Sequence, residues 1–194
     1  MIHRRALPLL LTVLLLPISC RSQLPPQQEL AAAASNGSLD SIRHALERGA
    51  SPNLYRAGNE TPLGLLIQGY KRSTPDRQKE IEEAVSYLLA RGADPNALHH
   101  GFTPLQIATG QGSDVIVSRL LTFGADPDMD TRAGLAPIWQ AVYDNNYTIG
   151  LTLLKAGANP DAKNTQGQTP LEYLKSKGYS RTRLMLHLRY YGGH

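Results

Sequence analysis

The feature that most constrains this chain is a short motif that recurs at nearly even spacing along most of its length. The motif reads Thr61-Pro62-Leu63, Thr103-Pro104-Leu105, Ala136-Pro137-Ile138 and Thr169-Pro170-Leu171. A Gly-Ala turn follows twenty residues after Pro104 and again twenty residues after Pro137, and the regular unit is 33 residues long. A unit of this size cannot bury its own apolar face, so the copies must stack into a solenoid.

Each regular unit carries the local signals of two helices. A proline at the first helical position loses no hydrogen bond, and the threonine before it can cap the helix. Apolar pairs then follow at helical spacing, as in Ile116-Val117 with Leu120-Leu121 and in Ile149 with Leu153-Leu154. A closing glycine adopts the left-handed conformation that ends a helix at low cost. The pattern therefore predicts a helix pair in every unit.

These stems, the Ile-Val-x-x-Leu-Leu helix and the Gly-Ala-Asp turn resemble the ankyrin repeat over nearly all of residues 28–194. The resemblance implies an all-α ankyrin-repeat solenoid of about five stacked helix-turn-helix units joined by short β-hairpin turns. We expect the units near residues 28–53, 57–96, 101–128, 134–161 and 167–194. The first lacks the Thr-Pro stem, and in the last we expect Leu184, Leu188 and Tyr191 to carry the apolar stripe. Both read as terminal caps.

The second unit departs from the regular spacing. Pro62 lies 30 residues before Gly92, where the regular units show twenty. The extra residues fall around Tyr70-Lys71-Arg72-Ser73, and Thr74-Pro75-Asp76 then reads as a new helix start. We expect the insertion to lengthen the second helix backward and to add a basic loop. It is either a tolerated surface loop or a partner contact.

Residues 1–19 read as a signal peptide. A charged start at His3-Arg4-Arg5 precedes an apolar stretch over residues 6–16, which is too short to span a bilayer comfortably. Cys20, the one cysteine of the sequence, follows Ser19 and resembles the lipid-attachment cysteine of bacterial lipoproteins, although Pro17 stands where that family favours leucine. Ordinary signal cleavage nearby is the alternative.

If the lipoprotein resemblance holds, Cys20 carries lipid and residues 20–27 are a short polar tether ahead of the repeat domain at 28–194. Arg21 follows the cysteine, rather than the aspartate that typically retains such proteins in the inner membrane. The resemblance then implies a protein of the bacterial cell envelope, located in the periplasm and anchored to the outer membrane.

Composition and motifs exclude several classes of function. The formal charge is +4, and without Arg4 and Arg5 it falls to 18 basic against 16 acidic residues, or +2, which gives no basic stripe for nucleic acid. No nucleophile elbow, phosphate loop or paired-carboxylate motif appears, so we expect neither enzymatic activity nor a cofactor. His99 and His100 are adjacent and diverge, so we expect no metal site.

The resemblance implies a protein partner on the concave face, formed by the hairpin tips and the inner helices, and a monomer when free. Unusual residues there predict the contacts. Phe102 and Leu135 replace normally polar tip residues and would form an exposed apolar pair. Trp139, Tyr143 and Tyr147 add aromatic residues of the types that dominate interfaces. The full predicted set is His99, His100, Phe102, Arg132, Leu135, Trp139, Tyr143, Asp144, Tyr147 and Tyr179.

Two functions fit a tethered binding domain without chemistry of its own. The first is an immunity protein that neutralises a toxin delivered to the periplasm by neighbouring cells, such as a phospholipase or a peptidoglycan-cleaving enzyme. The second is a periplasmic scaffold or assembly factor for a resident enzyme, such as one in oxidative-stress defence. Both rest on architecture and address rather than on a motif.

Overall fold

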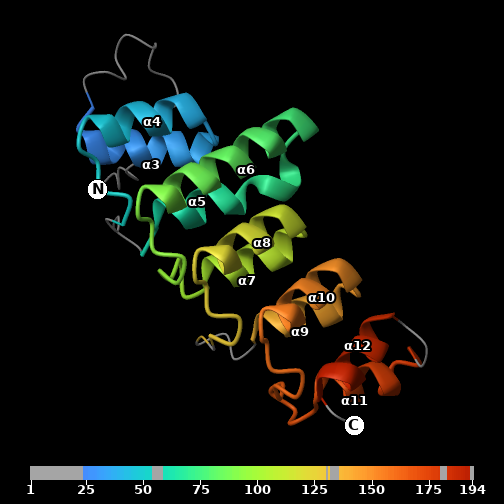
Figure 1. Cartoon of the computed structure of the whole chain (residues 1–194). Helices are drawn as coiled ribbons and strands as arrows, with labels where there is room; N and C mark the ends of the chain where they lie inside the picture. Colours follow the sequence, from blue (N-terminus) through green and yellow to red (C-terminus); the bar gives the residue numbers. More distant parts are fainter. Residues whose placement is uncertain (1–23, 54–58, 130, 132–135, 180–182, 193–194) are drawn as a thin grey trace, which may run out of the picture.

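The computed structural model describes residues 24–53, 59–129, 131, 136–179 and 183–192, so Cys20 and residues 1–19 lie outside the described part. The described residues form ten α-helices and one 3-10 helix, η1 (Figure 1). In chain order they are α3 (Pro26–Asn36), α4 (Leu39–Glu47), α5 (Pro62–Gln68), η1 (Tyr70–Arg72), α6 (Pro75–Ala90), α7 (Pro104–Gln111), α8 (Asp114–Thr122), α9 (Pro137–Tyr143), α10 (Tyr147–Lys155), α11 (Pro170–Ser176) and α12 (Arg183–Gly192).

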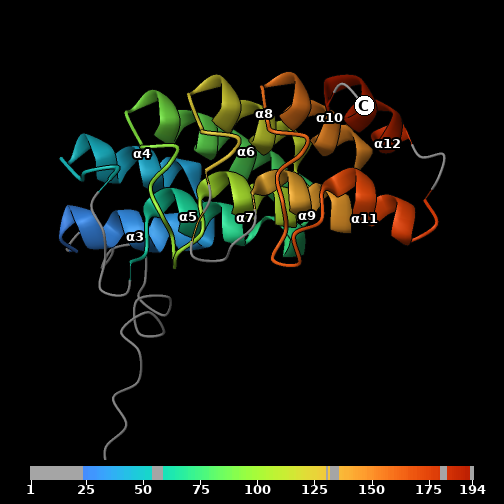
Figure 2. The ribbon, with the colours of Figure 1, turned by 90° about the horizontal axis from the view of Figure 1, so that it is seen from below.

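The helices form two layers, which Figure 2 shows edge-on. The first helix of each unit (α3, α5, α7, α9 and α11) lies in the inner layer, and the second (α4, α6, α8, α10 and α12) lies in the outer layer. The described ends of the chain lie at opposite ends of the stack (Figure 1). The predicted all-α solenoid is confirmed, and strand-like pairing in the described residues is limited to isolated bridges such as His99 with Phe102.

The stem threonines start the inner helices as predicted. The hydroxyl oxygens of Thr61, Thr103 and Thr169 each accept a hydrogen bond from the backbone N–H three residues later. At Thr103 and Thr169 the side chain of that third residue also bonds back to the threonine N–H, which completes a capping box. Ala136 offers no such oxygen, and α9 begins with its proline alone.

The core runs between the two layers along the whole stack. The predicted stripes are buried, with Ile116, Leu120, Ile149 and Leu153 all at 0% exposure. α12 departs from the expectation: Leu184, Met185 and Leu188 are buried, whereas Tyr191 is 39% exposed. The buried side of α12 is the side that faces α10 and α11. Leu184 and its neighbour Met185 both lie on that side, so Met185 belongs to the apolar stripe and Tyr191 does not.

Hydrogen bonds between successive turns tie the units together at one edge. The Asn53 side chain donates to the Gly92 carbonyl at 2.7 Å and accepts from the Asp94 N–H at 2.7 Å. Asn96 repeats this pair with Gly124 and Asp126, at 3.1 and 2.9 Å. At the next step the equivalent residue is Asp128, which accepts from the Asn159 N–H at 2.8 Å but, as a carboxylate, has no proton to donate.

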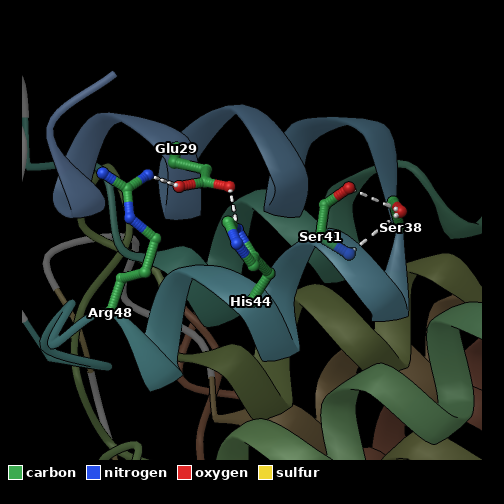
Figure 3. Close-up of polar contacts among 5 residues, drawn as sticks. All are labelled: Glu29, Ser38, Ser41, His44 and Arg48. Atoms are coloured by element: carbon green, nitrogen blue, oxygen red, sulfur yellow. Dashed lines mark hydrogen bonds and ion pairs between the residues drawn. The ribbon is translucent and has the colours of Figure 1, made fainter. Parts of the chain in front are cut away.

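A buried carboxylate joins the two helices of the first unit. Glu29 on α3 is 7% exposed, and its oxygens lie 2.7 Å from His44 Nδ1 and 2.5 Å from Arg48 Nη1 (Figure 3). His44 lies on α4, and Arg48 is the residue that caps its C-terminal end. At the start of α4, Ser38 caps the helix by accepting from the Ser41 N–H (Figure 3).

The insertion in the second unit is held in place by both neighbouring units. As predicted, it lengthens the outer helix: α6 has 16 residues, against 9 in α4, α8 and α10. Arg77 near its start donates to the Asn36 carbonyl of the first unit, and Glu80 accepts from the Leu39 N–H there. On the other side, the Lys71 N–H donates to Gln111 of the third unit at 3.0 Å. The insertion is therefore built into the stack.

Among the described helices, none is long and apolar enough to cross a membrane.

Candidate protein-binding face

The inner helices share one exposed face. It is formed by the third, sixth and seventh residues after each stem proline, all of which are half-buried or exposed, while the residues between them are mostly buried. From α5 to α11 these residues are Leu65, Gln68 and Gly69; Ile107, Gly110 and Gln111; Gln140, Tyr143 and Asp144; and Tyr173, Ser176 and Lys177. We call this set the inner-helix face. Its composition changes from one unit to the next, so it is a candidate for selective recognition.

A shallow groove crosses this face between α7 and α9. It has a volume of about 300 Å³ and is lined by Phe102, Gln106, Ile107, Gly110, Gln111, Ala136, Pro137 and Gln140. Phe102 stands beside the groove at the hairpin with 45% of its surface exposed, as predicted. Gly110 keeps the groove open, because a Cβ atom there would have no neighbour closer than 3.8 Å, the Gln140 Cγ. We call this hollow the α7–α9 groove.

An aromatic cluster borders the groove on its C-terminal side. The Tyr143 ring on α9 is 41% exposed and meets the Tyr173 ring of α11 edge to face, with centroids 5.1 Å apart. The Lys177 ammonium lies 5.6 Å from the centre of the Tyr173 ring. Asp144 is exposed next to Tyr143 and accepts a hydrogen bond from Gln140 at 2.9 Å. The cluster therefore offers a rigid aromatic surface with charges of both signs at its rim.

The structure corrects the interpretation of Trp139 as a surface contact. Its side chain is 0% exposed, and the indole N–H donates to the Ala162 carbonyl at 2.8 Å. The ring lies beneath the cluster, 5.4 Å from the Tyr143 ring and 5.8 Å from the Tyr173 ring. Trp139 therefore supports the two tyrosines from below and cannot itself reach a partner.

His99 is also corrected, because it is 2% exposed. Its Nδ1 accepts from the Thr61 N–H at 3.1 Å, and its Nε2 lies 3.1 Å from Gln68 Oε1. The imidazole fills the space over Gly64, where a Cβ atom would come within 2.2 Å of the His99 Cγ. Burial, and secondarily the neighbouring His100, lower the pKa of His99 to about 4. His99 is thus a neutral brace between the second and third units.

The remaining predicted residues do not all share one face. His100 is exposed at the hairpin, 3.8 Å from the Glu60 carboxylate, and Tyr179 is 44% exposed after α11. Tyr147 begins α10 and packs its ring against His187 of α12 at 5.4 Å, so it belongs to the outer layer. Arg132 and Leu135 lie outside the described residues. The structure therefore brings Phe102, Tyr143 and Asp144 onto the inner-helix side.

Sequence reasoning missed Ile107, Gly110, Gln140 and Tyr173, which complete the face. A signal was present. Aligning the four stems and comparing the third, sixth and seventh following positions identifies these residues directly. Within the described part of the chain, no group of three or more histidine, cysteine or acidic residues could hold a metal ion.

Comparison with known proteins agrees with this architecture. A family model described as "Ankyrin repeats (3 copies)" matches residues 30–128 and 77–164. The mitochondrial disaggregase of Bos taurus is 30% identical over 74% of this chain, which spans 29% of that protein. Neurogenic locus notch homolog protein 1 of Danio rerio is 30% identical over 73% of this chain, which spans 6% of it.

A shorter relative is matched over most of its own length. The cyclin-dependent kinase 4 inhibitor B of Rattus norvegicus is 33% identical over 54% of this chain and is covered over 82% of its length. The stacked helix pairs, the capped Thr-Pro stems and the matched residues 30–164 together show that this chain belongs to the ankyrin-repeat family.

Proposed function

We propose that this chain is a protein-binding module that holds its partner on the inner-helix face, with Phe102 and the α7–α9 groove at one side and the Tyr143–Tyr173 cluster at the other. The observation that carries the proposal is the apolar area gathered there. Phe102 lines a groove of about 300 Å³ and is 45% exposed, and Tyr143, three residues after the groove residue Gln140 on α9, is 41% exposed. Large aromatic side chains held in fixed positions beside a hollow are the usual anchors of an interface.

The test compares two double variants of the full chain. Phe102→Ala with Tyr143→Ala removes the proposed anchors. Val115→Ala with Phe123→Ala is the matched control, because these outer-layer residues, on α8 and directly after it, are 38% and 41% exposed. After a partner is captured from envelope extracts and purified, calorimetry measures its affinity for each variant. We expect the first variant to lose roughly thirtyfold or more in affinity and the control to change less than threefold.

A partner that binds the anchor variant as tightly as the parent, or that loses affinity for the control instead, would place the interface elsewhere. The insertion is then the next candidate, because Lys71 and Arg72 are exposed beside the inner-helix face. Melting curves of all variants accompany the titration. Equal melting temperatures show that a change in affinity arises from lost contacts.

We further propose that the module works in the bacterial periplasm as an immunity protein, tethered to the outer membrane through an acylated Cys20. The support is the apolar leader that ends at the sole cysteine, together with a chain whose motifs suggest no chemistry of its own. The relative matched over most of its length is named an inhibitor, which fits a short ankyrin chain acting by binding alone. We propose no catalytic role for it.

The two levels of this proposal are tested separately. Metabolic labelling with a fatty acid should mark the parent chain and not Cys20→Ser, whereas equal labelling would exclude this anchor. For the immunity role, the captured partner should be a secreted enzyme that damages the envelope, and addition of the chain in equal amount should abolish its activity. Capture of a resident enzyme that keeps its activity in the complex would support the scaffold role instead.

A further inference from the structure

A second surface stands out on the opposite side of the molecule, at the C-terminal end of the outer layer. There α10 and α12 lie side by side (Figure 2). Between them is a shallow hollow of about 300 Å³ lined by Leu151, Lys155, Leu186, His187, Tyr190 and Tyr191, which we call the α10–α12 patch. Leu186, Tyr190 and Tyr191 are 57%, 81% and 39% exposed. No function described above uses this surface.

The charge around the patch is mostly positive, although the Asp161 carboxylate lies near Gly192 at the end of α12. The helices α10 and α12 contain no acidic residue, whereas Lys155, Arg183 and Arg189 are exposed on them. Residues 145–194 carry seven basic and two acidic side chains. At the other end of the outer layer, α4 and α6 together contain six acidic residues, so the excess of positive charge is a property of the C-terminal end.

We infer that the α10–α12 patch docks on the surface of an anionic phospholipid membrane. Tyrosine and leucine side chains on one helix face, flanked by arginine and lysine, form the composition that lies at a lipid–water interface. The rings and Leu186 enter the headgroup region, while the long cationic side chains remain at lipid phosphates. A second copy of the chain is the less suitable occupant, because pairing two such patches would oppose like charges.

The side chains of α12 are held in an arrangement that suits this contact. Leu184, Met185 and Leu188 fix the helix on the core, which leaves Leu186 and Tyr190, one turn apart, on the outer side. The Tyr190 and Tyr191 rings meet edge to face at 5.2 Å, and Arg183 lies 5.9 Å from the centre of the Tyr147 ring. Membrane contact therefore requires no rearrangement of the fold.

The test uses the full chain with Cys20→Ser, so that the contact is measured without an acyl anchor and with one introduced cysteine. An environment-sensitive fluorophore is attached at Tyr191→Cys in one protein and at Lys79→Cys, an exposed position on α6, in a control protein. Each labelled protein is mixed with two kinds of vesicle. One kind is phosphatidylcholine alone, and the other is phosphatidylcholine with 30 mol% of the anionic lipid phosphatidylglycerol. Both proteins carry the same apolar leader, so only a difference between the two labels counts as contact of the α10–α12 patch.

On the anionic vesicles, we expect the emission of the fluorophore at position 191 to shift to shorter wavelength and to be protected from a water-soluble quencher. The fluorophore at position 79 should show neither change. Lys155, Arg183 and Arg189 are attracted to anionic lipid and not to neutral lipid. We therefore expect binding to neutral vesicles to be about a hundredfold weaker than binding to anionic vesicles. In the position-191 background, Leu186→Ser with Tyr190→Ser should weaken binding by about tenfold or more, whereas Val115→Ser with Phe123→Ser should leave it unchanged.

Three results would overturn the inference: no protection at position 191 on anionic vesicles, equal protection on both lipid compositions, or concentration-dependent self-association that alone accounts for the shift. Because none of these measurements involves the inner-helix face, failure here leaves the proposed partner binding untouched.

Discussion

Acidification should selectively weaken the joint between the second and third units, because His99 is buried there as a neutral base. Its Nδ1 accepts the Thr61 N–H at 3.1 Å. A proton on Nδ1 would remove that acceptor and place a charge in a site that is 2% exposed. The pKa of His99 is lowered to about 4 in the folded chain, against about 6.5 in an unfolded one.

The sign follows from proton binding. Between pH 4 and 6.5 the unfolded chain binds more protons at this residue than the folded chain, so the free energy of unfolding rises with pH through that window and falls as the solution is acidified. The full difference corresponds to about 3 kcal/mol, and about 2 kcal/mol of it is lost by pH 5.

The measurement is urea unfolding followed by circular dichroism at pH 5.0, 6.0 and 7.5, for the parent chain and for His99→Gln. Glutamine can still accept from the Thr61 N–H, and it does not titrate. We expect His99→Gln to be the less stable protein at pH 7.5, and its deficit to shrink by about 2 kcal/mol at pH 5.0. The two proteins share every other ionisable group, so the difference between them isolates residue 99. If the two proteins lose stability in parallel between pH 7.5 and 5.0, the neutral-brace interpretation is refuted.

Three further substitutions test packing between units by thermal and urea unfolding. Gly64→Ala should destabilise the chain by about 1–3 kcal/mol, because its Cβ atom would come within 2.2 Å of the His99 ring; a variant as stable as the parent would contradict the fit described here. Gly110→Ala should stabilise it by up to about 1 kcal/mol, since the new methyl group meets no atom closer than 3.8 Å and helix propensity improves; a loss of stability would show that the groove is tighter than described. Asp128→Asn should raise the free energy of unfolding by about 1 kcal/mol, because an asparagine can donate to the Gly157 carbonyl as Asn53 and Asn96 donate to the equivalent carbonyls. An unchanged unfolding midpoint would mean that the missing hydrogen bond does not limit stability.

Sequence reasoning succeeded where the signal is local. Thr-Pro stems, closing glycines and the spacing of Ile116 with Leu120 fix helix ends and buried stripes through short-range geometry, and the observed caps and core follow them. The lengthened α6 was readable for the same reason, because Pro75 after Thr74 marks a helix start.

Burial of individual ring residues could not be predicted in this way, because it depends on the size of a neighbour far along the chain. His99 is buried because residue 64, 35 positions earlier, is a glycine. Trp139 is buried because its indole reaches the Ala162 carbonyl of the segment that leads to the next unit. Histidine and tryptophan are residue types that often contact a partner. Only the packing between units shows that His99 and Trp139 belong to the core.

The insertion in the second unit has a consequence for how the molecule unfolds. In a regular solenoid each unit is coupled only to its nearest neighbours, and unfolding can begin at either end and advance one unit at a time. Here α6 and η1 bond to the first unit through Asn36 and Leu39 and to the third through Gln111. These bonds strengthen the coupling of the second unit to both of its neighbours, so we expect the first three units to unfold together as an N-terminal block. Beyond them, the hydrogen bonding between successive turns is weaker, because Asp128 lacks the donor that Asn53 and Asn96 supply. Under heat or mechanical pulling, this solenoid should come apart from its C-terminal end, with the N-terminal block lost last and all at once.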